Sequence, residues 1–583
     1  MPLSDGAPAT RYGLPTILGV FALLCFGCAL VGLFADRSST LISQYFLATQ
    51  DTPVLFALGF ACVALALVAR RRTQTAAPAF VARVPGFGLA IVLAIIAAGI
   101  AYLGAYVVQL NHPLSIDEFL ANFDAKIFAS GHLIAPVAPE WRDYVPAMQP
   151  VFRLPVPDNA FWVSSYLPMN AAIRALFVVI GDAALENAVL AGVAIVALYG
   201  VARRLWPDRP DAAAVSVVLL ACSSQFLITA MTPYAMTAHL AFNLVWLWLF
   251  LRDTRASHAC AAGVAFIACG LHQVVFHPLF AAPFVLSLFI ARRWRLAAYY
   301  TLVYAASAMF WILYWKLLLH GVGAPSADSA DVGMGNFVHR VLDLIGLDAT
   351  SIALMSLNLV RFLAWQAPIT LPLAVVGLLA SRRDPVVNKL ALGMVFMLGL
   401  VLIVLPYQGH GWGYRYLHGF LGSISLIAAQ GWIVVFNGER VSRPIAAAFV
   451  SSAVFALLVL LPWRAWQVRS FVAPHAAFAK VIANSRAPVV VVDAADVWNG
   501  ADMIRNDPLL RMPPKVIVLG YLDEAALKLL CRRYDVDFFD RNDVQRLGLR
   551  TAPSTPNFAE RSRTQRELMK SLDCGRPGRA GGS

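Results

Sequence analysis

A succession of long apolar runs constrains the fold of this chain more than any other feature. A helix needs about 20 apolar residues to cross a bilayer core of about 30 Å, and lipid offers no partner to an unpaired backbone amide. Only 14% of the 583 residues are charged, against about 25% in soluble proteins, so a soluble fold is excluded. The sequence predicts a polytopic α-helical membrane protein with about thirteen spans, at 14–34, 54–70, 86–109, 184–202, 212–230, 234–251, 258–274, 278–291, 297–318, 365–381, 388–406, 417–436 and 444–463.

Basic side chains predict the orientation, because Lys and Arg gather in the cytoplasmic loops of membrane proteins. Six arginine clusters fall on one side of the predicted spans. We therefore expect a cytoplasmic N-terminus, with the loops 111–183 and 319–364 and the chain after Trp463 on the outer side. The same rule explains the net charge of +13 without a nucleic-acid partner. The clusters are Arg70-Arg71-Arg72, Arg203-Arg204, Arg252 with Arg255, Arg292-Arg293 with Arg295, Arg382-Arg383, and Arg440 with Arg443.

A soluble domain is predicted after the last span. Three short runs rich in β-branched or aromatic residues follow one another, and a helix-like stretch at 522–534 lies between the last two. Strands that alternate with helices are typical of a small α/β domain with a parallel sheet. Cys531 and Cys574 can pair there if the compartment is oxidising. The runs are 488–493, 515–520 and 535–540, and the expected parts are a transmembrane domain at 1–463, an extracytoplasmic α/β domain at 464–550 and a flexible tail at 551–583.

Two adjacent carboxylates follow the third span. Asp117 and Glu118 come just after Ser115 and begin a predicted amphipathic helix. One interpretation is a helix N-terminus, in which Ser115 is the cap and the acids interact favourably with the helix dipole. The other is a general base at the membrane face, where partial burial tunes a carboxylate. Both can hold, because a base in a first helical turn has a fixed orientation.

The motifs of this loop resemble the first external loop of the membrane-embedded GT-C glycosyltransferases, most closely the protein O-mannosyltransferase and lipid A aminoarabinose transferase branch. The similarity covers about residues 85–295, and the rest of the chain is similar in architecture only. Close aminoarabinose transferases carry Lys where Leu167 stands, and a second acid where Thr232-Pro233-Tyr234 stands. The motifs are Asp117-Glu118, Ser130-Gly131, Leu133-Ile134-Ala135-Pro136 and Ser165-Tyr166-Leu167-Pro168.

The resemblance implies a GT-C-like fold and a reaction. It implies that Asp117 deprotonates an acceptor hydroxyl, with Glu118 as its neighbour or orienter. The hydroxyl attacks the anomeric carbon of a polyprenyl-phosphate sugar with inversion. Because the leaving group is a phosphate, the site needs a cation. The external candidates are Arg153, Lys316, His339-Arg340, Arg361 and Tyr414-Arg415.

The segment 408–418 is the densest polar and aromatic cluster beside a predicted span. Arg415 suits a bidentate phosphate contact and is the leading phosphate ligand, with Tyr414 and His410 as further donor contacts. The alternative is an interfacial Trp/Tyr belt with a snorkelling arginine. Tyr166 and His272 complete the predicted donor-binding set. No metal ligand is assigned, no other cofactor is predicted, and a divalent cation stays an open alternative.

We therefore expect a glycosyltransferase of the bacterial inner membrane. Its predicted partners are a polyprenyl-phosphate-linked sugar, membrane lipids and an extracytoplasmic glycan, lipid or protein acceptor. Two alternatives stay open: a transporter or flippase of a lipid-linked sugar, which would use Asp117 and Glu118 in a proton relay, and an envelope glycan polymerase or ligase. The sequence has no Walker A or GxGxxG motif that would support an ATP-driven pump or a dinucleotide enzyme.

Overall fold

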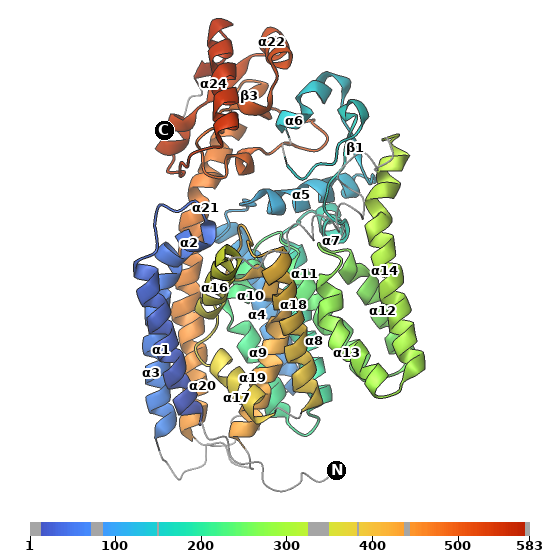
Figure 1. Ribbon diagram of the computed structural model, residues 1–583, viewed down its shortest axis with the longest axis vertical. Coiled ribbons are helices and arrows are strands. Elements are labelled where there is room, and N and C mark those ends of the chain that lie inside the picture. Colours follow the sequence, from blue (N-terminus) through green and yellow to red (C-terminus); the bar gives the residue numbers. More distant parts are fainter. Residues whose placement is uncertain are drawn as a thin grey trace.

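The computed structural model describes residues 13–71, 86–148, 151–324, 349–381, 384–436 and 443–577. Long helices form a bundle, and a smaller domain lies at one end of it (Figure 1). The long bundle helices are α1 (Leu14–Leu33), α3 (Thr52–Arg70), α4 (Gly86–Val107), α8 (Leu185–Leu205), α14 (Trp294–Gly321), α18 (Pro385–Val404), α19 (Leu421–Val435), α20 (Arg443–Phe455) and α21 (Leu461–Ala483). The shorter ones are α2 (Ile42–Phe46), α9 (Pro210–Ala221), α10 (Ser224–Thr229), α11 (Met236–Arg252), α12 (Arg255–Cys269), α13 (Phe276–Ile290), α16 (Ala349–Ala364) and α17 (Thr370–Ala380).

Each predicted span coincides with one of these helices or with two in succession. Within the described ranges, 8 continuous helical stretches are long and apolar enough to cross a membrane by length and composition, with the adjoining α20 and α21 counted as one. The other predicted spans are apolar helices of 10–17 residues. The chain is thus a multi-pass α-helical membrane protein, and the predicted fold class is confirmed.

The packing of α4 shows why these sequences form a membrane bundle. Its buried face consists of small residues such as Ala94 and Ala101, which let α8 and α9 approach closely. Its large apolar side chains point outward: Ile95 is 66% exposed and Leu103 is 62% exposed. Lipid can cover such an outer face, whereas water cannot do so without a large cost in free energy.

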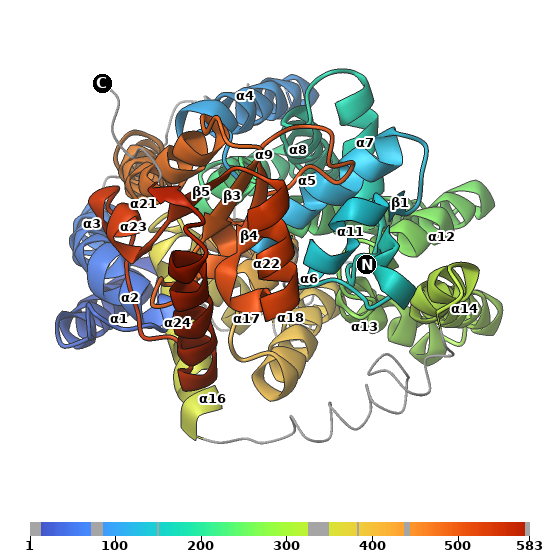
Figure 2. The ribbon, with the colours of Figure 1, turned by 90° about the horizontal axis from the view of Figure 1, so that it is seen from above.

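A layer of short helices lies across one end of the bundle. It is formed by the loop predicted at 111–183 and contains α5 (Ile116–Ala129), α6 (Val145–Met148) and α7 (Met169–Val179). A short antiparallel pair of strands, β1 (Ala135–Pro136) and β2 (Phe161–Trp162), joins its two halves. Figure 1 shows this layer at the same end of the bundle as the C-terminal domain, and Figure 2 shows that domain above the middle of the bundle, beside α5.

The C-terminal domain has the predicted parallel sheet. The strand order is β4-β3-β5-β6, and each of the three predicted runs contains one strand. Its helices α22 and α24 pack on each other, and Cys531 and Cys574 form a disulfide. The elements are β3 (Val489–Val492), β4 (Lys515–Val518), α22 (Glu524–Arg533), β5 (Val536–Phe539), α23 (Arg541–Arg546), α24 (Pro556–Ser571) and β6 (Arg576–Pro577), with single-turn helices η6 (Gly500–Met503) and η7 (Leu519–Tyr521).

The structure differs from the expectation of a flexible tail at 551–583. Residues 556–571 form α24, which packs on the domain through the buried Met569. Arg566 of this helix pairs with the buried carboxylate of Asp493. The sequence analysis missed this helix because its residues are mostly polar and charged. Its few apolar side chains are buried only when the helix packs on the domain.

Candidate functional site

Ser115 begins α5 as a helix cap. Its side chain accepts a hydrogen bond from the backbone N–H of Glu118 at 3.4 Å. The Glu118 carboxylate in turn accepts from the backbone N–H of Leu114 at 2.5 Å. These contacts satisfy amides that a helix start leaves free, so the cap interpretation describes the local structure. They also fix the orientation of Asp117 in the first turn.

Asp117 contacts a phenol and a cation. Its Oδ1 accepts from the Tyr166 hydroxyl at 2.6 Å, and its Oδ2 lies 2.8 Å from Nη1 of Arg415. The side chains are 16% exposed for Asp117 and 9% for Arg415, so the ion pair is largely shielded from water. Burial alone would raise the pKa of Asp117, but the guanidinium and the phenol hold it below the ordinary aspartate range. Asp117 is therefore ionised at neutral pH.

Arg415 is held by the loop that precedes it. Its backbone N–H donates to Oε1 of Gln408 at 3.0 Å, and its guanidinium lies over the rings of Tyr234 and Tyr416. Gly413 allows the tight turn, since its φ is +69° and a Cβ there would press on Gln225. One donor is unused: Nε of Arg415 is buried and has no acceptor among the described residues.

Asp117 lines a small cavity of about 30 Å³, here named the Asp117 cavity, whose wall mixes polar and apolar side chains. His272 lies in its wall, and the His272 ring contacts the Tyr166 ring at 5.3 Å. Burial lowers the pKa of His272 to about 4, so this ring is neutral and can donate or accept hydrogen bonds. The cavity is lined by Asp117, Ala121, Asp124, Tyr166, Leu167, Asn170, Ala171, Pro233, Tyr234, Ala235, Leu271 and His272.

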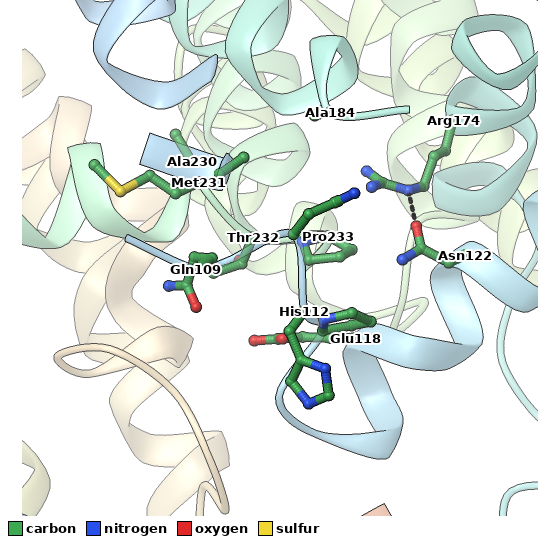
Figure 3. A pocket seen from close by; sticks show the side chains of 13 residues that line it. Gln109, His112, Glu118, Asn122, Arg174, Ala184, Ala230, Met231, Thr232 and Pro233 are labelled. Atoms are coloured by element: carbon green, nitrogen blue, oxygen red, sulfur yellow. Dashed lines mark hydrogen bonds between the residues drawn. The ribbon is translucent and has the colours of Figure 1, made fainter. Parts of the chain in front are cut away.

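Glu118 faces a different cavity. Successive helical residues are about 100° apart, so the two neighbouring acids of α5 diverge. Glu118 lines a small cavity of about 20 Å³ with His112, Gln109 and Arg174 (Figure 3). Burial raises the pKa of Glu118 to about 8, which leaves this acid mostly protonated at neutral pH. Glu118 therefore differs from Asp117 both in the cavity that its side chain lines and in its charge at neutral pH.

The C-terminal domain reaches into the site through η6 and the residues around it. Oδ1 of Asp502 accepts from the backbone N–H of Ile116 at 2.9 Å, and Oδ2 lies 3.6 Å from Nε2 of His410. Asn499 also contacts His410 Nε2, at 2.8 Å, and Arg505 donates to the carbonyl of Leu114 at 3.2 Å. These residues were missed by the sequence analysis, because a loop about 390 positions from α5 carries no local signal of contact.

Three further predicted site residues lie elsewhere. The Tyr414 hydroxyl donates to Sδ of Met355 at 3.3 Å, so this side chain points away from Asp117. Lys316 lies on α14, which packs on α12 and α13. Arg340 lies outside the described residues.

Arg361, another predicted phosphate ligand, is used inside the bundle. It pairs with Asp51, whose other carboxylate oxygen lies 2.8 Å from Nη2 of Arg464. All three side chains are fully buried. Arg361 also donates to the carbonyl of Gly411 at 3.0 Å, which fixes the loop that carries Arg415. These contacts indicate that Arg361 positions this loop.

The residues near Asp117 do not fit a divalent cation. Both carboxylate oxygens of Asp117 already have partners, and Glu118 faces the other cavity. In the part of the chain that the structure describes, no three His, Cys, Asp or Glu side chains are grouped as metal ligands would be. We assign no residue to a metal.

An apolar groove of about 630 Å³, here named the α7 groove, lies close to the Asp117 cavity. The segment 167–172 separates them: Leu167 and Ala171 line the cavity, whereas Pro168, Met169 and Ala172 line the groove. The other walls come from the end of α5 and from α14, with Phe128, Trp311 and Tyr314. The cavity that contains the charged Asp117 and the apolar groove thus share one wall.

The fold and the site define a polytopic membrane protein with a charged site between its helix bundle and the C-terminal domain. The sequence matches no protein-family model and no curated protein. Among solved structures, the chain is similar to ArnT from Cupriavidus metallidurans bound to undecaprenyl phosphate, with 14% identity, 79% of this chain and 91% of that chain covered, and a TM-score of 0.49. It is also similar to the oligosaccharyltransferase AglB from Archaeoglobus fulgidus in complex with an inhibitory peptide and a dolichol-phosphate, with 12% identity, 82% and 68% covered, and a TM-score of 0.47. At these values, neither likeness carries a functional conclusion.

Proposed function

We propose that this protein is a glycosyltransferase that moves one sugar from a polyprenyl-phosphate donor to an acceptor outside the cytoplasm. The observation that carries the proposal is the Asp117–Arg415 pair, in which the arginine keeps an unused N–H. Asp117 of this pair lines a cavity that shares a wall with the α7 groove. A lipid-linked sugar phosphate needs a cation for its phosphate, a base for the incoming hydroxyl and an apolar surface for its chain.

The donor extends over the segment 167–172, with its chain on one side of this segment and its sugar on the other. Its chain occupies the α7 groove, whose aromatic and aliphatic walls suit an isoprenoid. Its phosphate binds Arg415, and its sugar lies at the Asp117 cavity beside Tyr166 and His272, where the small cavity has to widen as the donor enters. The hydroxyl of Tyr166 and the ring nitrogens of neutral His272 are suitable partners for sugar hydroxyls.

The transfer itself is a displacement at the anomeric carbon. The acceptor oxygen forms a bond to this carbon while the bond from the carbon to the phosphate oxygen breaks, which inverts the configuration. The electron pair of that bond stays on the polyprenyl phosphate, where Arg415 stabilises the developing charge. The proton of the acceptor hydroxyl passes to the carboxylate of Asp117.

The ion pair gives this reaction an order of events. While Arg415 lies against Asp117, the carboxylate is a weak base, because the guanidinium lowers its pKa. A donor phosphate competes for the same guanidinium. As Arg415 turns toward the phosphate, Asp117 loses part of its counter-charge in a shielded cavity and becomes a stronger base. Donor binding therefore activates the residue that receives the proton.

We further propose the bacterial inner membrane as the location, with the C-terminal domain on the outer side. The Cys531–Cys574 disulfide supports an oxidising compartment for this domain. The contacts of Asp502 and Arg505 with the start of α5 support the same side for the site. The proposed division keeps a transmembrane domain at 1–463 and places α24 in the C-terminal domain.

The test is sugar transfer by the purified protein in detergent. Polyprenyl-phosphate sugars that differ in the sugar are incubated with an extracted envelope acceptor, and Asp117→Asn is measured beside the wild type. One added sugar per acceptor, lost in the variant, supports the proposal. A ladder of added sugars supports a polymerase instead. Movement of lipid-linked sugar across proteoliposomes without transfer supports a flippase.

A further inference from the structure

A third cavity, of about 220 Å³, opens between the bundle and the C-terminal domain, and we name it the Trp498 cavity. Its walls come from α2 and the segment that joins it to α3, from α21 and from the domain. Figure 1 shows α2 beside α21 where α21 leaves the bundle. This volume is below the range of about 300–1,000 Å³ that drug-sized ligands occupy, which limits the ligand to a small one such as a single sugar ring.

The cavity has an aromatic wall. The ring of Trp498 lies 5.4 Å from that of Tyr45 and 6.1 Å from that of Phe471. Phe471 and Trp498 also contact the ring of His410, at 6.0 and 6.2 Å. The aromatic wall therefore lies between the Trp498 cavity and the loop that carries Arg415. Aromatic faces provide large, rigid apolar surfaces for a ring of similar size.

Two polar side chains in the same cavity have unused hydrogen-bonding atoms. Gln50 is only 6% exposed, and its Oε1 has no donor among the described residues. Arg550 lies over the rings of Tyr45 and Trp498 at 3.9 and 4.3 Å, yet its buried Nη1 has no acceptor there. A buried polar atom without a partner is costly, so a turn of either side chain toward a ligand in the cavity that supplies a partner is favoured.

The combination defines a class of ligand. An aromatic wall fits the flat face of a sugar ring, an amide oxygen accepts from a hydroxyl, and a guanidinium binds a phosphate or carboxylate. We propose that the Trp498 cavity binds a sugar that carries a phosphate or a carboxylate, at a site separate from the reacting atoms. If the chain is a glycosyltransferase as proposed above, this sugar belongs to the glycan part of its acceptor.

Direct binding tests the proposal independently of transfer. Calorimetric titrations use the full chain in a detergent without a sugar headgroup, with glucose 1-phosphate, mannose 1-phosphate, glucuronate, glucose and inorganic phosphate as probes. At least one anionic sugar is expected to bind about tenfold or more tighter than glucose or phosphate, a difference of roughly 1.4 kcal/mol. No binding by any anionic sugar, or equal binding by phosphate, overturns the proposal.

Two variants localise the binding. Arg550→Gln is expected to weaken the anionic sugar about tenfold or more and to leave glucose unchanged. Thr49→Trp fills the cavity from an exposed position and should abolish binding. Arg546→Gln is the matched control, because this exposed arginine pairs with Asp543 outside the cavity. Unchanged affinity in both cavity variants contradicts the assignment.

Asp117→Asn separates this proposal from the proposed reaction. The variant is expected to bind the anionic sugar as tightly as the wild type does, even if no transfer is ever detected. Loss of binding in Asp117→Asn would place the ligand in the Asp117 cavity and overturn the assignment. If transfer is detected, Arg550→Gln should raise the acceptor KM and leave kcat unchanged; an unchanged KM would exclude the acceptor as the source of the sugar.

Discussion

Oδ2 of Asp117 lies 2.8 Å from Nη1 of Arg415, although 298 positions separate the two residues in the chain. The pair joins the start of an external helix to the loop before a bundle helix. Each partner changes the chemistry of the other: the cation keeps the carboxylate ionised, and the carboxylate occupies the cation until another anion arrives.

Asp117→Asn should lower kcat by about 10²–10⁴-fold, the usual contribution of a positioned base. The amide oxygen can still accept from Tyr166, but Arg415 loses the counter-charge of a shielded ion pair, so the thermal unfolding temperature should fall while the protein still folds. Initial rates and a melting curve check both statements. Glu140→Gln, at an exposed acid of the same external loop, is the control and should behave as the wild type. A fully active Asp117→Asn protein would exclude this residue as the base.

Arg415→Gln should raise the donor KM and shift the pH dependence of the transfer rate. The guanidinium lowers the pKa of Asp117, whereas burial raises it. Without the guanidinium the burial effect remains, so the pKa of Asp117 rises and the acid limb of the profile moves to higher pH. Rates measured from pH 4 to 8 (roughly the range in which carboxylates titrate in proteins) show the limb. An acid limb that stays in place would mean that Asp117 is not the titrating base.

Asp502 should act as a positioning residue for Asp117, because it contacts Ile116 and His410 at the same time. Asp502→Ala should lower kcat and speed hydrogen exchange in the first turn of α5. Asp502→Asn keeps an oxygen for the Ile116 amide and should restore protection and most activity. Asp507→Asn is the matched control, because Asp507 pairs with Lys126 nearer the other end of α5. Equal effects of the alanine and asparagine variants would argue against positioning through this hydrogen bond.

The contribution of Glu118 to stability should be lost as the pH rises through about 8. Burial raises the pKa of Glu118 to about 8, so between its unfolded and folded pKa values the native state binds the extra proton and this acid lowers the free energy of unfolding as the pH rises. Buried histidines act in the opposite direction, because burial lowers the pKa of His272 to about 4 and that of His410 to about 3. The difference between two proteins isolates the acid: from pH 6 to 8, roughly the upper part of the range between the unfolded and folded pKa values of Glu118, the melting temperature of Glu118→Gln should rise relative to that of the wild type. A difference that does not change with pH would contradict the assignment to this acid.

Ala172→Trp should narrow the α7 groove without touching the ion pair, since Ala172 lines only the groove. The expected result is a raised KM for donors with long polyprenyl chains and a smaller change for short-chain donors. Steady-state kinetics with both donors measures the ratio. A uniform change for the two donors would mean that the chain does not lie in this groove.

The sequence by itself determined the features that depend on neighbouring residues. Apolar runs are local, so each predicted span coincides with a helix, and the alternation of strand-like and helical segments after Trp463 predicted the parallel sheet. The cap at Ser115 was also readable, because a capping side chain acts within three residues. The acids after Ser115 could therefore be placed in a first helical turn.

Only the tertiary structure decided which of these residues meet. Local pattern does not show that Arg415 faces Asp117, that Glu118 faces another cavity, or that Arg361 pairs with Asp51. Such pairings depend on how helices far apart in the chain pack, and packing is set by the shapes of many side chains together. For the same reason the contact of Asp502 with the start of α5 exists only after the C-terminal domain has docked.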